Sequence, residues 1–315
     1  MPSNLKKAVC FLLVTIISFS CLLLCGCQKQ SSDKPVIVTT LFPQFDFVRQ
    51  LCGDEVESVC LLSPGVESHS YDPSPKDIQT VADCGLFVYT GDEMEPWAGS
   101  VIASCPETPV LCLTDGINVI TGDHDEDEDE HEHEEHEHSY DPHIWLDLQN
   151  AQKMVNAIAD KITELFPSLS ATVSKNRETY CATLSDLDSR FKTAVSASPD
   201  KTVVFGGRFA YAYFVKRYGL KYKTVYSGCS AEVEPSAKHV EEIINFIKQN
   251  NVRYILHEEL SDPKVARSIS EATDAQLLEF STAHNVAKDQ FDNGITFTVI
   301  MEENLFNLKK ALDQV

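Results

Sequence analysis

Histidines with acidic and polar neighbours are the residues of this sequence that could do chemistry, and the chemistry they suggest is metal binding. Eleven carboxylates and five histidines lie between Asp123 and His138. Two further histidines, His69 in PGVESHSYDPSP and His143 in SYDPHIWLD, stand in proline-flanked segments between an expected strand and an expected helix. Such loops lie at the carboxyl ends of parallel strands, where ligands bind. Because imidazole is a common metal ligand, we expect His69 and His143 to hold an ion.

The run from Asp123 to His138 has two interpretations. Its like charges repel one another and have no apolar partners, so it cannot fold by itself. It is either a solvated spacer or a mobile collector that binds zinc weakly, and we expect the collector. His143 then belongs to the ordered site, and the accessory histidines are His124, His131, His133, His136 and His138.

Strands alternate with helices in both halves of the chain, which is typical of a parallel α/β sheet. Apolar residues also recur at helical spacing over about eight turns after Pro167. We therefore expect an α/β fold with two lobes, each a mainly parallel sheet flanked by helices, with a cleft between them. The expected parts are an N-terminal lobe over 35–167 with an acidic His-rich loop over 122–139, a long rigid linking helix over 168–198, and a C-terminal lobe over 199–315.

The N-terminus has the features of a lipoprotein export signal. Lys6 and Lys7 precede an apolar run that ends in Leu24-Cys25-Gly26-Cys27. We expect residues 1–26 to be the signal peptide, Cys27 to be lipidated, and residues 27–34 to be a tether. The alternative is a transmembrane anchor, but the run is shorter than the roughly 20 residues that a spanning helix needs. The protein is thus expected at the outer face of the cell membrane, or in the periplasm.

Charge and cysteine content narrow the possibilities further. The net charge is −22, and the acidic run supplies half of it. No basic patch is present, so nucleic acid is not an expected partner. The sequence contains no CxxC pair, so a zinc site made of cysteines is not expected. Cys52 with Cys60, or Cys105 with Cys112, could form a disulfide. With Cys27 lipidated, the number of remaining cysteines is odd: Cys52, Cys60, Cys84, Cys105, Cys112, Cys181 and Cys229.

Several motifs together resemble the zinc- and manganese-specific solute-binding proteins of ABC transporters. They are PGVESHSYDPSPKDI, DPHIWLD, YAYFVKRYGL and VEPSAKHVEEII, and they cover nearly the whole mature chain in order. The resemblance implies two α/β lobes joined by a long helix, with one metal ion bound between them. It also implies that the first-lobe ligands are His69 and His143, and a His-rich acidic loop is typical of the zinc branch.

The second lobe departs from the pattern of that family. Arg208 stands where its members carry a histidine or a glutamate, and Ser281 stands where they usually carry an aspartate or an asparagine. Arginine has no lone pair with which to ligate a cation. We expect His284, three residues after Ser281, to be the third ligand, and Glu259 to be a weaker candidate for the fourth. Arg208 could then pair with Glu259 or with Glu232.

Three imidazoles with a carboxylate or a water suit tetrahedral Zn²⁺. The expected function is capture of extracytoplasmic Zn²⁺ by a monomer and its delivery to an ABC permease and its ATPase, without catalysis. Binding should weaken as the pH falls through about 6.5. The alternatives are a manganese transport protein, which would need more oxygen ligands, a surface adhesin or zinc reservoir, and a zinc hydrolase. No HExxH or nucleophile-elbow motif supports the hydrolase.

Overall fold

A computed structural model describes residues 34–66, 71–121, 140–226 and 235–314. Residues 35–315 form one compact unit. The predicted signal peptide, His69, the acidic run and Cys229 all lie outside the described residues. In the described part of the chain, no helix is both long enough and apolar enough to cross a bilayer.

Four short parallel strands form the sheet of the first lobe in the order β2-β1-β3-β4. Helix α3 begins as the sequence predicts, because the Ser74 hydroxyl accepts a hydrogen bond from Asp77 N and the Asp77 carboxylate accepts one from Ser74 N. The elements are β1 (Val36–Thr39), α2 (Phe42–Cys52), β2 (Glu57–Cys60), α3 (Pro75–Ala82), β3 (Leu86–Tyr89), α4 (Ala98–Ser104) and β4 (Val110–Cys112).

The second lobe repeats this arrangement with parallel strands in the order β6-β5-β7-β8. In each lobe the second strand in the chain is an edge strand that pairs with the first. The two sheets therefore have the same topology. The elements are β5 (Thr202–Phe205), α7 (Ala212–Tyr218), β6 (Lys221–Thr224), α8 (Ala237–Asn250), β7 (Tyr254–His257), α9 (Lys264–Thr273), β8 (Gln276–Glu279), α10 (Lys288–Asp292) and α11 (Phe297–Ala311).

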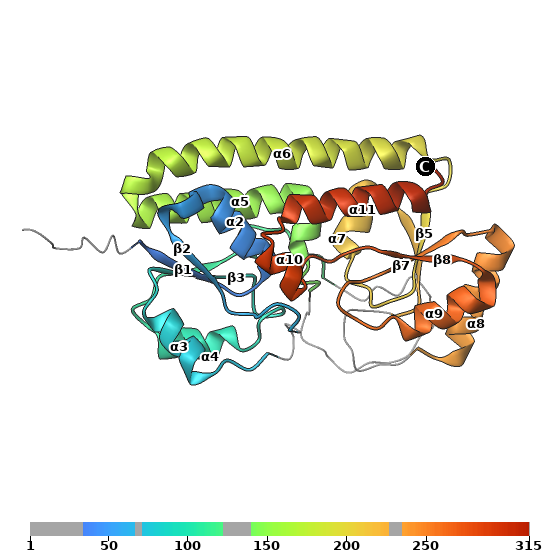
Figure 1. The fold of residues 1–315 in the computed structure, drawn as a ribbon, viewed down its shortest axis with the longest axis horizontal. Coiled ribbons are helices and arrows are strands. Elements are labelled where there is room, and N and C mark those ends of the chain that lie inside the picture. Colours follow the sequence, from blue (N-terminus) through green and yellow to red (C-terminus); the bar gives the residue numbers. More distant parts are fainter. Residues whose placement is uncertain (1–33, 67–70, 122–139, 227–234, 315) are drawn as a thin grey trace, which may run out of the picture. The chain divides into compact units, whose positions relative to one another are not determined.

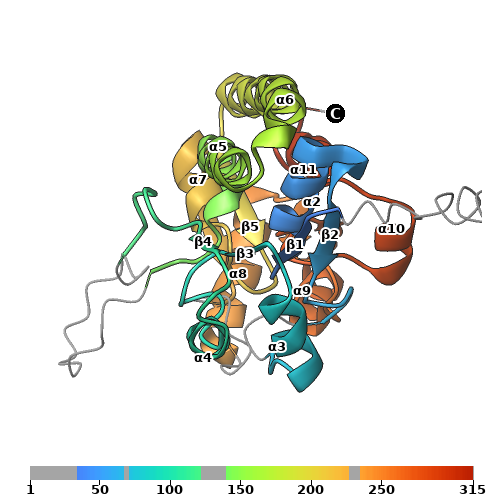
Figure 2. The ribbon, with the colours of Figure 1, turned by 90° about the vertical axis from the view of Figure 1, so that its left-hand side faces the viewer.

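Helix α6 (Ser170–Ala197) joins the two lobes and agrees with the predicted linking helix. With 28 residues it is about 42 Å long. It lies along α5 (Leu148–Leu165) at the first lobe and along α11 at the second (Figure 1; Figure 2). Its buried face is aromatic and aliphatic, including Tyr180, Leu184 and Phe191. The predicted fold of two α/β lobes joined by a long helix is therefore confirmed.

The two lobes share one continuous apolar core. A single cluster of buried side chains runs from Ile37 in the first lobe through Trp145 and Phe191 to Phe205 and Phe280 in the second. Smaller clusters fill the outer side of each sheet. Because close-packed side chains resist rearrangement, the shared core stiffens the junction between the lobes.

The cysteines do not form the disulfides that the sequence left open. Every cysteine in the described residues is a free thiol, so neither the Cys52–Cys60 nor the Cys105–Cys112 bridge is present. Burial raises the pKa of the thiols of Cys52 and Cys60 to about 12, which keeps them protonated and unreactive. Stability of the first lobe thus comes from its packing.

The carboxyl group of Glu95 is buried in the first lobe, and no cationic side chain of the described residues pairs with it. Glu95 Oε2 accepts hydrogen bonds from the backbone N–H groups of Thr90 and Gly91 (both 3.1 Å). The Thr40 hydroxyl touches both Glu95 Oε1 and Gln44 Oε1, but it has only one proton to donate. Both contacts are satisfied if Glu95 is protonated. Burial accordingly raises the pKa of Glu95 to about 7, against the opposing effect of these hydrogen bonds.

This raised pKa makes a prediction about stability. Between about pH 4.5 and pH 7, Glu95 binds more protons in the folded protein than in the unfolded chain. The free energy of unfolding should therefore fall as the pH rises through this range, by about 1–3 kcal/mol in all. Glu95→Gln should remove this decline in urea titrations made in the presence of a chelator. The control is Glu107→Gln, at an exposed glutamate of the same lobe. Equal pH profiles for both variants would contradict the assignment.

Candidate metal site

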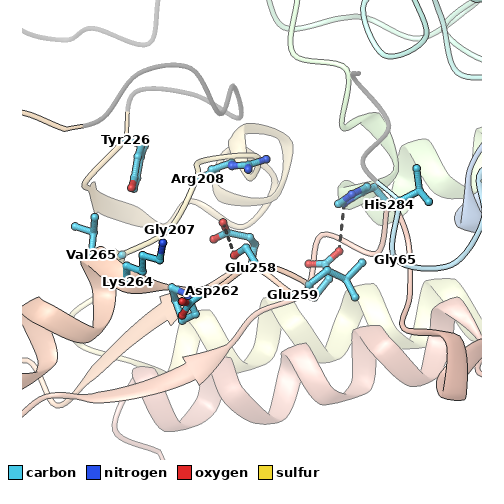
Figure 3. A pocket seen from close by; sticks show the side chains of 15 residues that line it. Gly65, Gly207, Arg208, Tyr226, Glu258, Glu259, Asp262, Lys264, Val265 and His284 are labelled. Carbon is cyan, nitrogen blue, oxygen red and sulfur yellow. Dashed lines mark hydrogen bonds and ion pairs between the residues drawn. The ribbon is translucent and has the colours of Figure 1, made fainter. Parts of the chain in front are cut away.

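The loops that follow the strands of the second lobe line a pocket of about 540 Å³ (Figure 3). Arg208 follows β5, Glu258 and Glu259 follow β7, and His284 follows β8. All of these strands are parallel, so their carboxyl ends meet at one edge of the sheet. Gly65 and Val66, after β2 of the first lobe, complete the wall. The pocket therefore lies where the two lobes meet.

His284 is held by a chain of hydrogen bonds that ends in a buried carboxylate. Its Nδ1 lies 2.6 Å from Thr282 Oγ1 and 3.3 Å from Glu259 Oε1. The Thr282 hydroxyl donates to Glu259 Oε1 and its backbone N–H donates to Oε2, both at 2.7 Å. With Nδ1 protonated for these contacts, Nε2 is the ring nitrogen that carries the lone pair.

The charge of Glu259 follows from the same contacts. Burial alone raises the pKa of this carboxyl group, but the hydrogen bonds from His284 and Thr282 outweigh it and hold the pKa below its usual value. The carboxylate is therefore ionised, and both of its oxygens accept hydrogen bonds. A carboxylate behind Nδ1 is the usual outer partner of a metal-binding histidine.

The backbone next to these groups is strained. Leu260, directly after Glu259, and Ala283, directly before His284, have φ values of 60° and 58°. Residues other than glycine rarely adopt this left-handed conformation, which costs about 1–3 kcal/mol. Neither is a glycine that would relieve the strain, so the surrounding contacts hold both loops in place.

His143 is positioned by an acidic neighbour in the same way. Its side chain is buried, and Nδ1 lies 3.0 Å from Asp141 Oδ1, which also accepts the backbone N–H of His143 at 2.8 Å. The ring packs edge-on against Trp145. Trp145 Nε1 in turn donates to the carbonyl of Thr282 at 2.7 Å. The His143 segment is therefore tied directly to the loop that carries His284.

The segment that leads to His69 is tied to the same loop. The Asn285 side chain donates to the carbonyls of Ser63 and Val66, both at 2.8 Å. Val66 lines the pocket, and His69 follows three residues later, outside the described residues. Among the residues that the structure describes, no three histidine, cysteine or acidic side chains form a cluster that could hold an ion. The ligand set of His69, His143, His284 and Glu259 thus stays a prediction.

Ser281 and two histidines outside the predicted ligand set have structural contacts. Ser281 accepts a hydrogen bond from Ala283 N, as in a turn. His257 Nδ1 contacts the carbonyl of Glu258, and His239, on helix α8, contacts the carbonyl of Thr224. Arg208 lines the pocket, but the described partners of Glu259 are His284 and Thr282, and Glu232 lies outside the described residues.

Sequence reasoning missed the supporting groups of the site. Thr282 and Asp141 each lie two residues before the histidine that they contact, so an acidic or hydroxyl residue at that spacing was an available indication. Nothing in the sequence pattern indicated the role of Glu259, because it lies 23 residues from Thr282 along the chain.

Comparisons with known proteins show the family to which this chain belongs. Residues 37–311 match the family described as zinc-uptake complex component A, periplasmic. The chain is 34% identical over 308 residues to the high-affinity zinc uptake system protein ZnuA of Bacillus subtilis, covering 97% of this chain and 95% of that protein. It is 30% identical over 316 residues to the zinc-binding lipoprotein AdcA of Streptococcus pneumoniae, covering 98% of this chain but 62% of AdcA.

A solved structure shows the same fold with zinc bound. The crystal structure of the Zn(II)-bound ZnuA-like domain of Streptococcus pneumoniae AdcA is similar with a TM-score of 0.74 at 27% identity, covering 89% of this chain and 100% of that domain. The predicted resemblance and the predicted zinc-uptake function are confirmed by these matches. The chain belongs to the family of periplasmic A components of zinc-uptake complexes.

Proposed function

We propose that this protein captures one Zn²⁺ outside the cytoplasm with the imidazoles of His69, His143 and His284, and passes it to an ABC permease. The observation that carries the proposal is the pairing of buried His143 and partly buried His284, each through Nδ1, with carboxylates at the junction of the lobes. This pairing makes Nε2 of both rings the ligating atom. Three imidazoles match the preference of zinc, and the names of the relatives support the same ion.

Glu259 takes part in this site as the carboxylate that orients His284. Its contacts to Thr282 and His284 would have to break before it could ligate the ion itself. An ionised partner at Nδ1 makes Nε2 a better donor and fixes the ring. The fourth coordination position is therefore open to water or to another ligand.

The remaining parts of the proposal concern location and release. The protein acts as a monomer, lipidated at Cys27 and tethered to the outer face of the membrane by residues 27–34. No reaction is catalysed. Because three histidines would release zinc slowly, docking on the permease separates the ligands. The histidines of the acidic run act as an accessory collector that raises the local zinc concentration.

Loss of a single ligand should abolish tight binding. His284→Ala and His143→Gln should each weaken zinc binding at least about 100-fold, since even the loss of an outer partner costs 10- to 100-fold. Calorimetric titration against a competing chelator measures the affinity. The control is His239→Ala, because this histidine lies on α8 and is not among the residues that line the pocket. Unchanged affinity in both site variants would contradict the proposal.

Removal of residues 123–138 separates the ordered site from the run. The shortened protein should still bind one zinc ion tightly, and the total number of bound ions should fall, because the weak sites have been deleted. Zinc titration followed by metal analysis measures both quantities. If the tight ion disappears with the run, the chain is a reservoir and not a capture protein.

A further inference from the structure

Thr282, in the loop after β8, is buried and uses each of its polar groups in a hydrogen bond. Its backbone N–H donates to Glu259 Oε2 and its hydroxyl donates to Glu259 Oε1, both at 2.7 Å. Its carbonyl accepts from Trp145 Nε1, also at 2.7 Å. Glu259 belongs to the second lobe and Trp145 to the first. Because both lobes hold Thr282, its hydroxyl group has a fixed place beside His284.

The hydroxyl oxygen of Thr282 is nearer to His284 than the Glu259 carboxylate is. His284 Nδ1 lies 2.6 Å from Thr282 Oγ1 but 3.3 Å from Glu259 Oε1 (Figure 3 shows the second contact). Hydrogen bonds between an N–H group and an oxygen weaken beyond about 3.2 Å. The main contact of the imidazole ring is therefore with the hydroxyl group, and the carboxylate acts from one step behind it.

The direction of these hydrogen bonds follows from the protons that each group has. A hydroxyl group carries one proton, so it can donate to only one of its two neighbours. The ionised carboxylate of Glu259 can only accept, and the Thr282 proton therefore points to it. The hydroxyl oxygen then accepts from Nδ1–H of His284. The charge of Glu259 thus determines which nitrogen of the ring carries the proton.

We propose that Thr282 is a positioning residue of the zinc site, whose hydroxyl group relays the charge of Glu259 to His284 and so keeps the lone pair of the ring on Nε2. This inference rests on the proposed function, in which Nε2 of His284 binds the ion. A ring with its proton on Nε2 has no lone pair there and does not bind zinc through that atom. No proton is transferred, and no covalent bond forms or breaks.

Glu259→Gln should reverse the relay while keeping the shape of the side chain. The backbone N–H of Thr282 can only donate, so the amide oxygen of the variant takes the position of Oε2. The amide NH₂ group then faces the Thr282 hydroxyl, which turns its proton toward His284 Nδ1. The ring must accept at Nδ1 and carry its proton on Nε2. Zinc binding should therefore weaken about 10- to 100-fold in calorimetric titration against a competing chelator.

The tautomer itself is measured by ¹⁵N NMR of zinc-free protein with labelled histidine, at about pH 8, where imidazole is neutral. The His284 signals are identified by their loss in His284→Ala. The unaltered protein should show the ring proton on Nδ1, and Glu259→Gln should show it on Nε2, because the two nitrogens of a neutral ring differ in chemical shift.

Variants of Thr282 test the hydroxyl group directly. Thr282→Ser keeps the hydroxyl and should match the unaltered protein in both measurements. Thr282→Val keeps the branched shape but loses the hydroxyl, so the ring should show a mixture of tautomers and zinc binding should weaken about 10-fold. Thr193→Val and Glu271→Gln, at exposed residues of α6 and α9, should change neither measurement.

Three results would overturn the inference. They are a ring proton on Nε2 in the unaltered protein, a ring proton that stays on Nδ1 in Glu259→Gln, and unweakened zinc binding by Thr282→Val. The first needs no variant, so the inference stays testable if a substitution prevents folding. Because the NMR measurement uses zinc-free protein, it is also independent of the proposed function. Failure of the unaltered protein to bind zinc tightly would overturn that function instead.

Discussion

The site depends on the hydrogen bonds that tie the loop after β8 to the first lobe. Trp145 Nε1 donates to the Thr282 carbonyl, and Asn285 donates to the carbonyls of Ser63 and Val66. All three bonds join residues more than 130 positions apart in the chain. Because buried polar groups are costly when left unpaired, the segments that carry the histidines stay together across the lobe junction.

These hydrogen bonds fix the positions of the segments that carry the histidines. A second set of contacts fixes the orientation of the imidazole rings. Each described site histidine presents Nδ1 to an acidic partner, Asp141 for His143 and Glu259 for His284. The left-handed backbone conformation of Ala283 is strained, so the surrounding contacts must hold the loop in this conformation. A site arranged before the ion arrives loses less conformational entropy on binding. The geometry therefore favours the tight capture that we propose.

The sequence predicted the fold well because the fold follows from local patterns. Alternating strands and helices, the Ser74 cap and the long amphipathic helix after Pro167 are all encoded by neighbouring residues. The same patterns predict that ligands bind at the loops after the strands. His284 was predicted as a ligand because it follows the strand that is now β8. The pairing of Glu259 with Thr282, the protonated Glu95 and the free thiols could not be predicted. They depend on side chains that only the folded chain brings together.

The central claim is that imidazoles from both lobes converge on one zinc ion. X-ray absorption at the zinc edge of protein loaded with one equivalent of zinc tests this most directly, because bound imidazole rings give a distinct scattering pattern. The account predicts three imidazole nitrogens at about 2.0–2.1 Å, in protein that lacks residues 123–138 as well as in the full chain. A shell made mainly of oxygen or sulfur in the shortened protein would contradict it.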